Sequence, residues 1–110
     1  MSKIDKMMRE LGHPEHLLGT NYIRVAVDLY RPGMSMTKEL YPGIAAAVGS
    51  TPSRVERSIR HSIETAWQRG STEVQLRMFG YTVDPQRGKP TVSEYVATMA
   101  RLIHESESAE

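Results

Sequence analysis

Apolar and polar residues alternate with a helical period most clearly between residues 51 and 70. Four apolar side chains recur there at spacings of four, four and three residues: Val55, Ile59, Ile63 and Ala66. Thr51 can cap the start of a helix, Pro52 suits its first position, and Gly70 can end it in the left-handed conformation. The pattern therefore predicts a helix of about five turns, with one apolar stripe, over residues 52–69.

The same period predicts further helices, each bounded by Gly, Pro or a capping residue. Their expected ranges are 2–11, 21–30 with a cap at Thr20 or Asn21, 42–48, a helix from its cap Ser71 to Phe79, and a last helix that Thr91 or Ser93 caps. Between and after them we expect a turn at 31–33, a short helix from near Thr37, a loop at 81–90 and a frayed acidic tail at about 105–110. We therefore predict a single all-α domain of about six helices over residues 1–110.

The elements between residues 42 and 69 follow the order of a helix-turn-helix. A short helix ends at Gly49, a turn of a few residues follows, and the longer helix begins at Pro52. In this motif the first helix crosses the DNA backbone and the second enters the major groove. The order of elements therefore favours DNA binding through the helix at residues 52–69.

Basic residues lie on the side of that helix away from its apolar stripe. Arg54, Arg57 and His61 follow one another at spacings of three and four, and Arg60 lies between them and the stripe. Arg can donate two parallel hydrogen bonds to guanine, and Glu can accept one from cytosine. The face has what a major-groove reader requires, although on this helix alone a solvated amphipathic helix is the favoured interpretation. The helix-turn-helix order is what shifts the interpretation to DNA binding. For Arg60 and His61 phosphate contact is favoured over base reading.

Glu56 has two interpretations. It could read a base from the first turns of the helix, or it could fold back as the acidic member of a capping box that begins at Ser53. Base reading is favoured, because Pro52 argues for a helix that begins at Thr51. In the predicted loop, Arg87 and Lys89 are candidate phosphate contacts.

Composition limits the other function classes. The chain has 110 residues, a formal charge of +1 and no cysteine, so any nucleic-acid surface must be local and thiol chemistry is excluded. We find no apolar run of membrane-spanning length and no signal peptide, and we expect a cytoplasmic protein. His13 and His16 have no third ligand nearby, and no nucleophile or phosphate loop is evident. We therefore predict no enzyme, no metal site and no cofactor, and we expect Trp67 in the core with a partner for its indole N–H.

Several ordered blocks of the chain match a known pattern. They are Leu11-Gly12-x-Pro14-x-His16, Leu40-Tyr41-Pro42-x-Ile44-Ala45, Thr51-x-Ser53-Arg54-Val55-Glu56-Arg57-x-Ile59-Arg60-His61, Phe79-Gly80-Tyr81-Thr82 and Lys89-Pro90-Thr91-x-Ser93-Glu94. Together they resemble the C-terminal DNA-binding domain of the stage-zero sporulation response regulator of spore-forming Firmicutes. The resemblance covers nearly the whole chain.

This resemblance implies a helix-turn-helix transcription regulator of the winged-helix-like superfamily, without a strand wing. It implies binding to a promoter box of the type TGTCGAA, in which residues matching Arg54, Glu56 and Arg57 read bases. The backbone or nearby positions are Thr51, Ser53, Arg60 and His61, to which the sequence adds Arg87 and Lys89. An RNA polymerase sigma factor and a second copy on tandem boxes are the further expected partners.

The chain departs from that family in its charges. Ala46, Ala47 and Val48 stand where the family usually carries lysines, and the tail is acidic. Both changes predict weaker DNA affinity with a shallower salt dependence. The 110 residues include no receiver domain, so the chain is either an excised effector domain or a stand-alone relative. The alternative function is a helical protein-interaction module that has lost DNA binding.

Overall fold

A computed structural model describes residues 2–80 and 88–108, and within those ranges the chain is helical without strands. Its α-helices are α1 (Lys3–Glu10), α2 (Leu18–Leu29), α3 (Tyr41–Val48), α4 (Pro52–Arg69), α5 (Thr72–Phe79) and α6 (Val92–Ser108), and a π-helical turn, η1 (Met36–Leu40), precedes α3. The predicted all-α fold of about six helices is confirmed.

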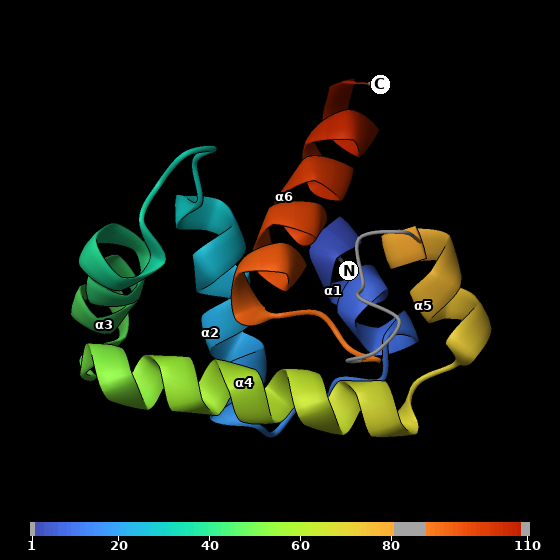
Figure 1. The fold of residues 1–110 in the computed structure, drawn as a ribbon, viewed down its shortest axis with the longest axis horizontal. Coiled ribbons are helices and arrows are strands. Elements are labelled where there is room, and N and C mark those ends of the chain that lie inside the picture. Colours follow the sequence, from blue (N-terminus) through green and yellow to red (C-terminus); the bar gives the residue numbers. More distant parts are fainter. Residues whose placement is uncertain (1, 81–87, 109–110) are drawn as a thin grey trace.

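Helix α4 lies along one side of the molecule, and α2, α3 and α6 pack against it (Figure 1). α2 crosses it near the middle, α3 lies by its start, and α5 follows its end. The core between α2, α4 and α6 is made of fully buried apolar side chains, among them Ile23, Ile59, Ile63, Val96 and Met99. Burying each such side chain stabilises the fold by roughly 1.5–3 kcal/mol. The packing therefore holds α4 by one face and leaves the opposite face open.

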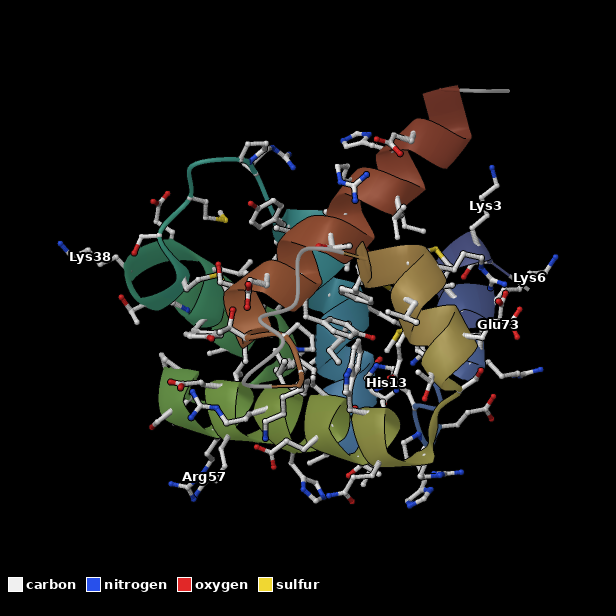
Figure 2. The ribbon with its side chains drawn as sticks, turned by 45° about the vertical axis from the view of Figure 1, so that its right-hand side comes forward. Lys3, Lys6, His13, Lys38, Arg57 and Glu73 are labelled. Carbon is white, nitrogen blue, oxygen red and sulfur yellow. The ribbon has the colours of Figure 1, made fainter. Side chains whose placement is uncertain are left out.

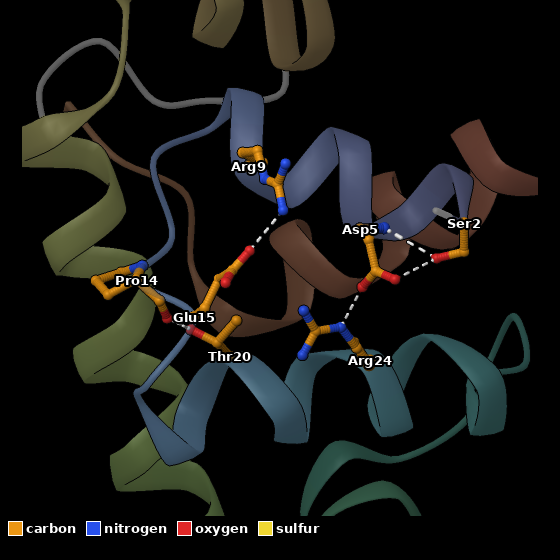
Figure 3. Close-up of polar contacts among 7 residues, drawn as sticks. All are labelled: Ser2, Asp5, Arg9, Pro14, Glu15, Thr20 and Arg24. Carbon is orange, nitrogen blue, oxygen red and sulfur yellow. Dashed lines mark hydrogen bonds and ion pairs between the residues drawn. The ribbon is translucent and has the colours of Figure 1, made fainter.

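The first helix follows the prediction, but the second begins earlier than predicted. Ser2 caps α1 by accepting a hydrogen bond from the Asp5 N–H at 3.2 Å, and Gly12 follows the helix with φ of +91°. α2 starts at Leu18, so the predicted cap at Thr20 or Asn21 is wrong. The Thr20 hydroxyl is instead buried inside the first turn, where it donates to the Pro14 carbonyl at 2.7 Å (Figure 3).

The segment before the helix-turn-helix is more continuous than the sequence indicated. The π-helical turn begins at Met36 and runs without a break into α3 at Tyr41. The Leu40 N–H donates to the Ser35 carbonyl at 3.0 Å, which is the wide spacing of a π-helix. Pro42 lies in the first turn of α3. α3 ends at Gly49, as predicted, in the left-handed conformation with φ of +70°.

Helix α4 has the predicted bounds, but it ends differently. The Thr51 hydroxyl accepts a hydrogen bond from the Arg54 N–H at 3.3 Å, which confirms the cap. Gly70 is extended, with φ of −77° and ψ of 165°, so the predicted left-handed ending is wrong. Glycine is required there for space, because a Cβ atom on Gly70 would lie 2.5 Å from the Leu11 carbonyl oxygen.

The last two helices begin at predicted caps. Ser71 caps α5, and Thr91 forms a reciprocal capping box with Glu94 at the start of α6. α6 continues to Ser108, so the prediction of a frayed tail is wrong for residues 105–108, while residues 109–110 lie outside the described ranges. Trp67 is half-buried and packs edge-on against Phe79, with 5.1 Å between ring centroids.

Candidate nucleic-acid interface

The outer face of α4 carries the basic residues that the sequence singled out. Arg54, Arg57 and His61 are all exposed, and Figure 2 shows Arg57 pointing away from the other helices. Among the described residues, neither Arg54 nor Arg57 forms an ion pair. Their guanidinium groups therefore keep their hydrogen-bonding capacity for a ligand outside the domain.

The start of α4 adds polar groups to this face. Thr51 and Ser53 are exposed there, and the Thr51 hydroxyl already serves as the helix cap. The first N–H groups of a helix and the helix dipole favour an anion at this end. A phosphate group could therefore approach the start of α4 while the arginine side chains point past it.

Glu56 pairs with Arg60 one turn further along α4. Arg60 donates from Nη2 to Oε1 of Glu56 at 2.5 Å, and both side chains are more than a third exposed. The alternative in which Glu56 completes a capping box from Ser53 is wrong, because Ser53 lies inside the helix and Thr51 is the cap. The side chain of Glu56 is thus held on the surface of α4 by its neighbour.

Tyr41 connects this pair to the first helix of the motif. It is a buried residue of α3, and its pKa is raised first by burial and then by the charge of Glu56, while Arg60 acts in the opposite direction. The charges of both members of the Glu56–Arg60 pair thus act on the Tyr41 hydroxyl. The two helices of the helix-turn-helix therefore meet at the flank of the basic face.

The loop residues are placed less favourably for phosphate. Lys89 donates to Glu64 on α4 at 3.1 Å, and together with Arg60 and Thr91 these residues border a pocket of about 300 Å³. Lys89 would have to leave that carboxylate, or share it, to contact DNA. Arg87 lies outside the described residues.

Sequence reasoning missed a polar cluster on the inner face of α4. His13 is buried and bonds to Ser62 from Nδ1 at 2.8 Å and to the Tyr95 hydroxyl from Nε2. Burial, and secondarily the charge of Arg24, lowers the pKa of His13 from 6.5 to about 4, so its ring is neutral at pH 7. A signal existed in the sequence, because Ser62 interrupts the apolar stripe between Ile59 and Ala66 and a buried hydroxyl needs a partner.

The described residues show neither a metal-binding cluster nor a membrane-spanning helix. No group of three or more His, Cys, Asp or Glu side chains within residues 2–80 and 88–108 could hold a metal ion. No helix in the same part of the chain is long and apolar enough to cross a membrane.

A family comparison agrees with this geometry. The chain matches the family model described as "Sporulation initiation factor Spo0A C terminal" over residues 4–103. The match includes all of α2, α3, α4 and α5 and most of α1 and α6. That family is one of DNA-binding, transcription-regulating domains rather than of enzymes. The chain therefore belongs to the family of C-terminal, DNA-binding domains of the sporulation initiation factor.

Proposed function

We propose that this domain reads a promoter box of the type TGTCGAA by inserting the first half of α4 into the major groove. The observation that carries the proposal is the exposure of Arg54 and Arg57 on the face of α4 that the rest of the domain leaves uncovered. A groove-reading helix needs a buried inner face and an open basic outer face, and α4 has both.

Base reading is assigned to three residues. Arg54 and Arg57 would each donate to guanine O6 and N7, and Glu56 would accept from the amino group of cytosine. The bond from Arg60 engages Oε1 of Glu56, and a carboxylate accepts hydrogen bonds on both oxygens. Glu56 can therefore accept from a base while Arg60 still holds it in place.

Phosphate contacts are assigned to the surroundings of those three residues. Thr51 and Ser53 lie at the start of α4, and His61 and Arg60 lie further along its exposed side. Lys89 and Arg87 are weaker candidates, the first because of its ion pair with Glu64. Each phosphate that a cationic side chain neutralises adds about 0.9 to the salt slope of binding, so a set with few cations predicts a shallow salt dependence.

The lack of basic side chains beside the turn of the helix-turn-helix supports a modest affinity for DNA. Ala46 and Ala47 are exposed on α3, where a lysine side chain could have reached the DNA backbone. With a formal charge of only +1, the domain has little long-range attraction for DNA. Binding of two copies to tandem boxes would compensate for this, and a sigma factor of RNA polymerase is the proposed protein partner. The proposed setting of this function is the cytoplasm.

The test is fluorescence anisotropy with a labelled duplex that carries TGTCGAA and with a scrambled duplex, at two salt concentrations. We expect the parent to prefer the box, and Arg57→Ala to lose roughly 1–3 kcal/mol of that preference. Arg101→Ala is the matched control, because Arg101 is an exposed arginine of α6 that pairs only with Glu105 among the described residues. Equal, weak binding of the parent to both duplexes would contradict the proposal and favour the protein-interaction module.

Tandem assembly has its own readout. On a duplex with two boxes, sedimentation or native mass spectrometry should find two protein chains bound to one duplex. A single species of one-to-one stoichiometry at saturating protein would contradict tandem assembly without affecting the assignment of Arg57.

A further inference from the structure

The buried cluster on the inner face of α4 joins three separate parts of the chain. His13 comes from the connector between α1 and α2, Ser62 from α4, and Tyr95 from α6. Thr20, in the first turn of α2, lies 3.0 Å from the Ser62 hydroxyl and donates to the Pro14 carbonyl (Figure 3). Figure 2 shows His13 in the interior, beside α4.

The donors and acceptors of this cluster fit together in one direction. Because the Thr20 proton is used on Pro14, Ser62 must donate to Thr20. The Ser62 proton is then used, so Nδ1 of His13 must donate to Ser62. Nε2 of the neutral ring is left as an acceptor, and the Tyr95 hydroxyl donates to it. Every polar side chain in this chain of bonds has a partner, as a buried group requires.

The connector that carries His13 and the first turn of α2 approach α4 on both sides of Ser62. A Cβ atom on Gly19 would lie 1.9 Å from the Ser58 carbonyl oxygen, and one on Gly70 would lie 2.5 Å from that of Leu11. Residues 11–20 therefore follow α4 from Ser58 to Gly70, which is about 18 Å of helix. The hydrogen bond from His13 to Ser62 lies between these two close approaches.

Directional bonds restrict a helix in a way that apolar packing does not. A hydrogen bond weakens steeply with misalignment, whereas apolar contacts are non-directional. If α4 rotated by about 20°, an atom about 6 Å from its axis would move by about 2 Å. A binding constellation tolerates displacements of about 0.5 Å. Small rotations of α4 would therefore take Arg54 and Arg57 out of register with the bases.

We propose that His13 is a positioning residue for DNA reading, because it fixes the rotation of α4 through Ser62 and ties that helix to α6 through Tyr95. The proposal rests on the proposed function of α4. His13 never touches DNA. Its effect reaches Arg54 and Arg57 because they lie one to two turns before Ser62 on the same rigid helix.

The test compares two variants of the full 110-residue chain. The triple variant His13→Leu, Ser62→Ala, Tyr95→Phe removes the whole chain of bonds at once, so that it leaves no buried polar group without a partner. The control is Val27→Ala, a buried position near the far end of α2 from Gly19. Three quantities are measured at pH 7.5: the urea midpoint, the ratio of affinities for the box and a scrambled duplex, and the amide chemical shifts of residues 54–57 without DNA.

We expect the triple variant to keep a urea midpoint close to the parent's and to lose about tenfold in preference for the box, comparable to one mismatched base pair. Its amide shifts at residues 54–57 should move. Val27→Ala should lower the midpoint and leave both the preference and those shifts unchanged. If the triple variant does not fold, Ser62→Ala alone, which removes the bonds of α4 to His13 and Thr20, should lose part of the preference and shift the same amides.

Two outcomes would overturn the proposal. One is a folded triple variant with the parent's preference and the parent's amide shifts, and the other is a loss of preference in Val27→Ala as large as that of the triple variant. A parent that prefers no duplex would contradict the proposed function instead. The amide shifts of residues 54–57 would then still decide whether His13 positions α4.

Discussion

The two faces of α4 use polar side chains in opposite ways. On the outer face, Arg54 and Arg57 are exposed and form no ion pair with any residue that the structure describes. On the inner face, Ser62 is fully buried and bonds to both His13 and Thr20. An exposed charge keeps its capacity for an outside ligand, whereas a buried hydroxyl must find its partners within the fold. The outer face can therefore bind a ligand. In our proposal, the inner face fixes the rotation of α4 and so the position of the arginine side chains on the outer face.

The close approach of α2 to α4 is the part of the inner face that should be most sensitive to change. Gly19→Ala would place a Cβ atom 1.9 Å from the Ser58 carbonyl oxygen, so we expect a loss of more than about 3 kcal/mol in the free energy of unfolding. Gly43→Ala is the matched control in α3, where the added Cβ would lie at an ordinary 3.5 Å from Leu29. Urea unfolding should show no loss for Gly43→Ala, and equal midpoints for both variants would contradict the close approach.

Acid should weaken the inner face of α4 through His13. His13 is neutral in the fold, and its pKa is lowered from 6.5 to about 4, so the unfolded chain takes up a proton that the folded chain resists. The contribution of the neutral His13 ring to the free energy of unfolding is therefore fully present above pH 6.5. It falls by about 3 kcal/mol as the pH drops to 4. The pKa of Asp5 is also lowered, first by Ser2 and then by Arg24, and its contribution is lost at still lower pH.

The measurement for this prediction is urea unfolding from pH 7.5 to 4. The triple variant His13→Leu, Ser62→Ala, Tyr95→Phe should lack the loss between pH 6.5 and 4, because it has no buried imidazole to protonate. A parent whose stability stays level over that range would show that His13 titrates normally in the fold.

The exposed pair on the flank of the outer face should contribute least to stability. Arg60→Ala breaks the ion pair with Glu56, in which both partners are more than a third exposed, and we expect a change of at most about 0.5 kcal/mol in unfolding. Its effect should appear instead on DNA, as a smaller preference for the box, because Glu56 is no longer held. A loss of stability as large as that of a core substitution would mean that this pair supports the fold.

The sequence could predict which side chains lie on the outer face of α4, because the residues that determine this all lie within or directly before one helix. Thr51, Pro52 and the apolar stripe determine the bounds of the helix, and those bounds determine which side chains share its exposed side. The inner face depends on partners far away in the chain. His13 and Ser62 are 49 residues apart, and His13 and Tyr95 are 82 apart, so no local pattern connects them.

The errors in the predicted helix ends have the same origin. The sequence suggested Thr20 as a cap, but tertiary contacts draw its hydroxyl into the buried cluster and α2 begins at Leu18. Gly70 was expected to be left-handed, but it is a glycine because Leu11 packs against it. In both places a contact between distant segments overrides the local preference of the residue.

The most direct test of the account is a thermodynamic cycle between the outer face and the DNA. Guanines of the TGTCGAA duplex are replaced one at a time by 7-deazaguanine, which lacks the N7 acceptor, and affinities are measured for the parent, Arg54→Ala and Arg57→Ala. We predict that each arginine couples to one guanine by about 1 kcal/mol or more, because groups in contact do not contribute additively. Additive effects for both arginines at every guanine would contradict base reading by α4.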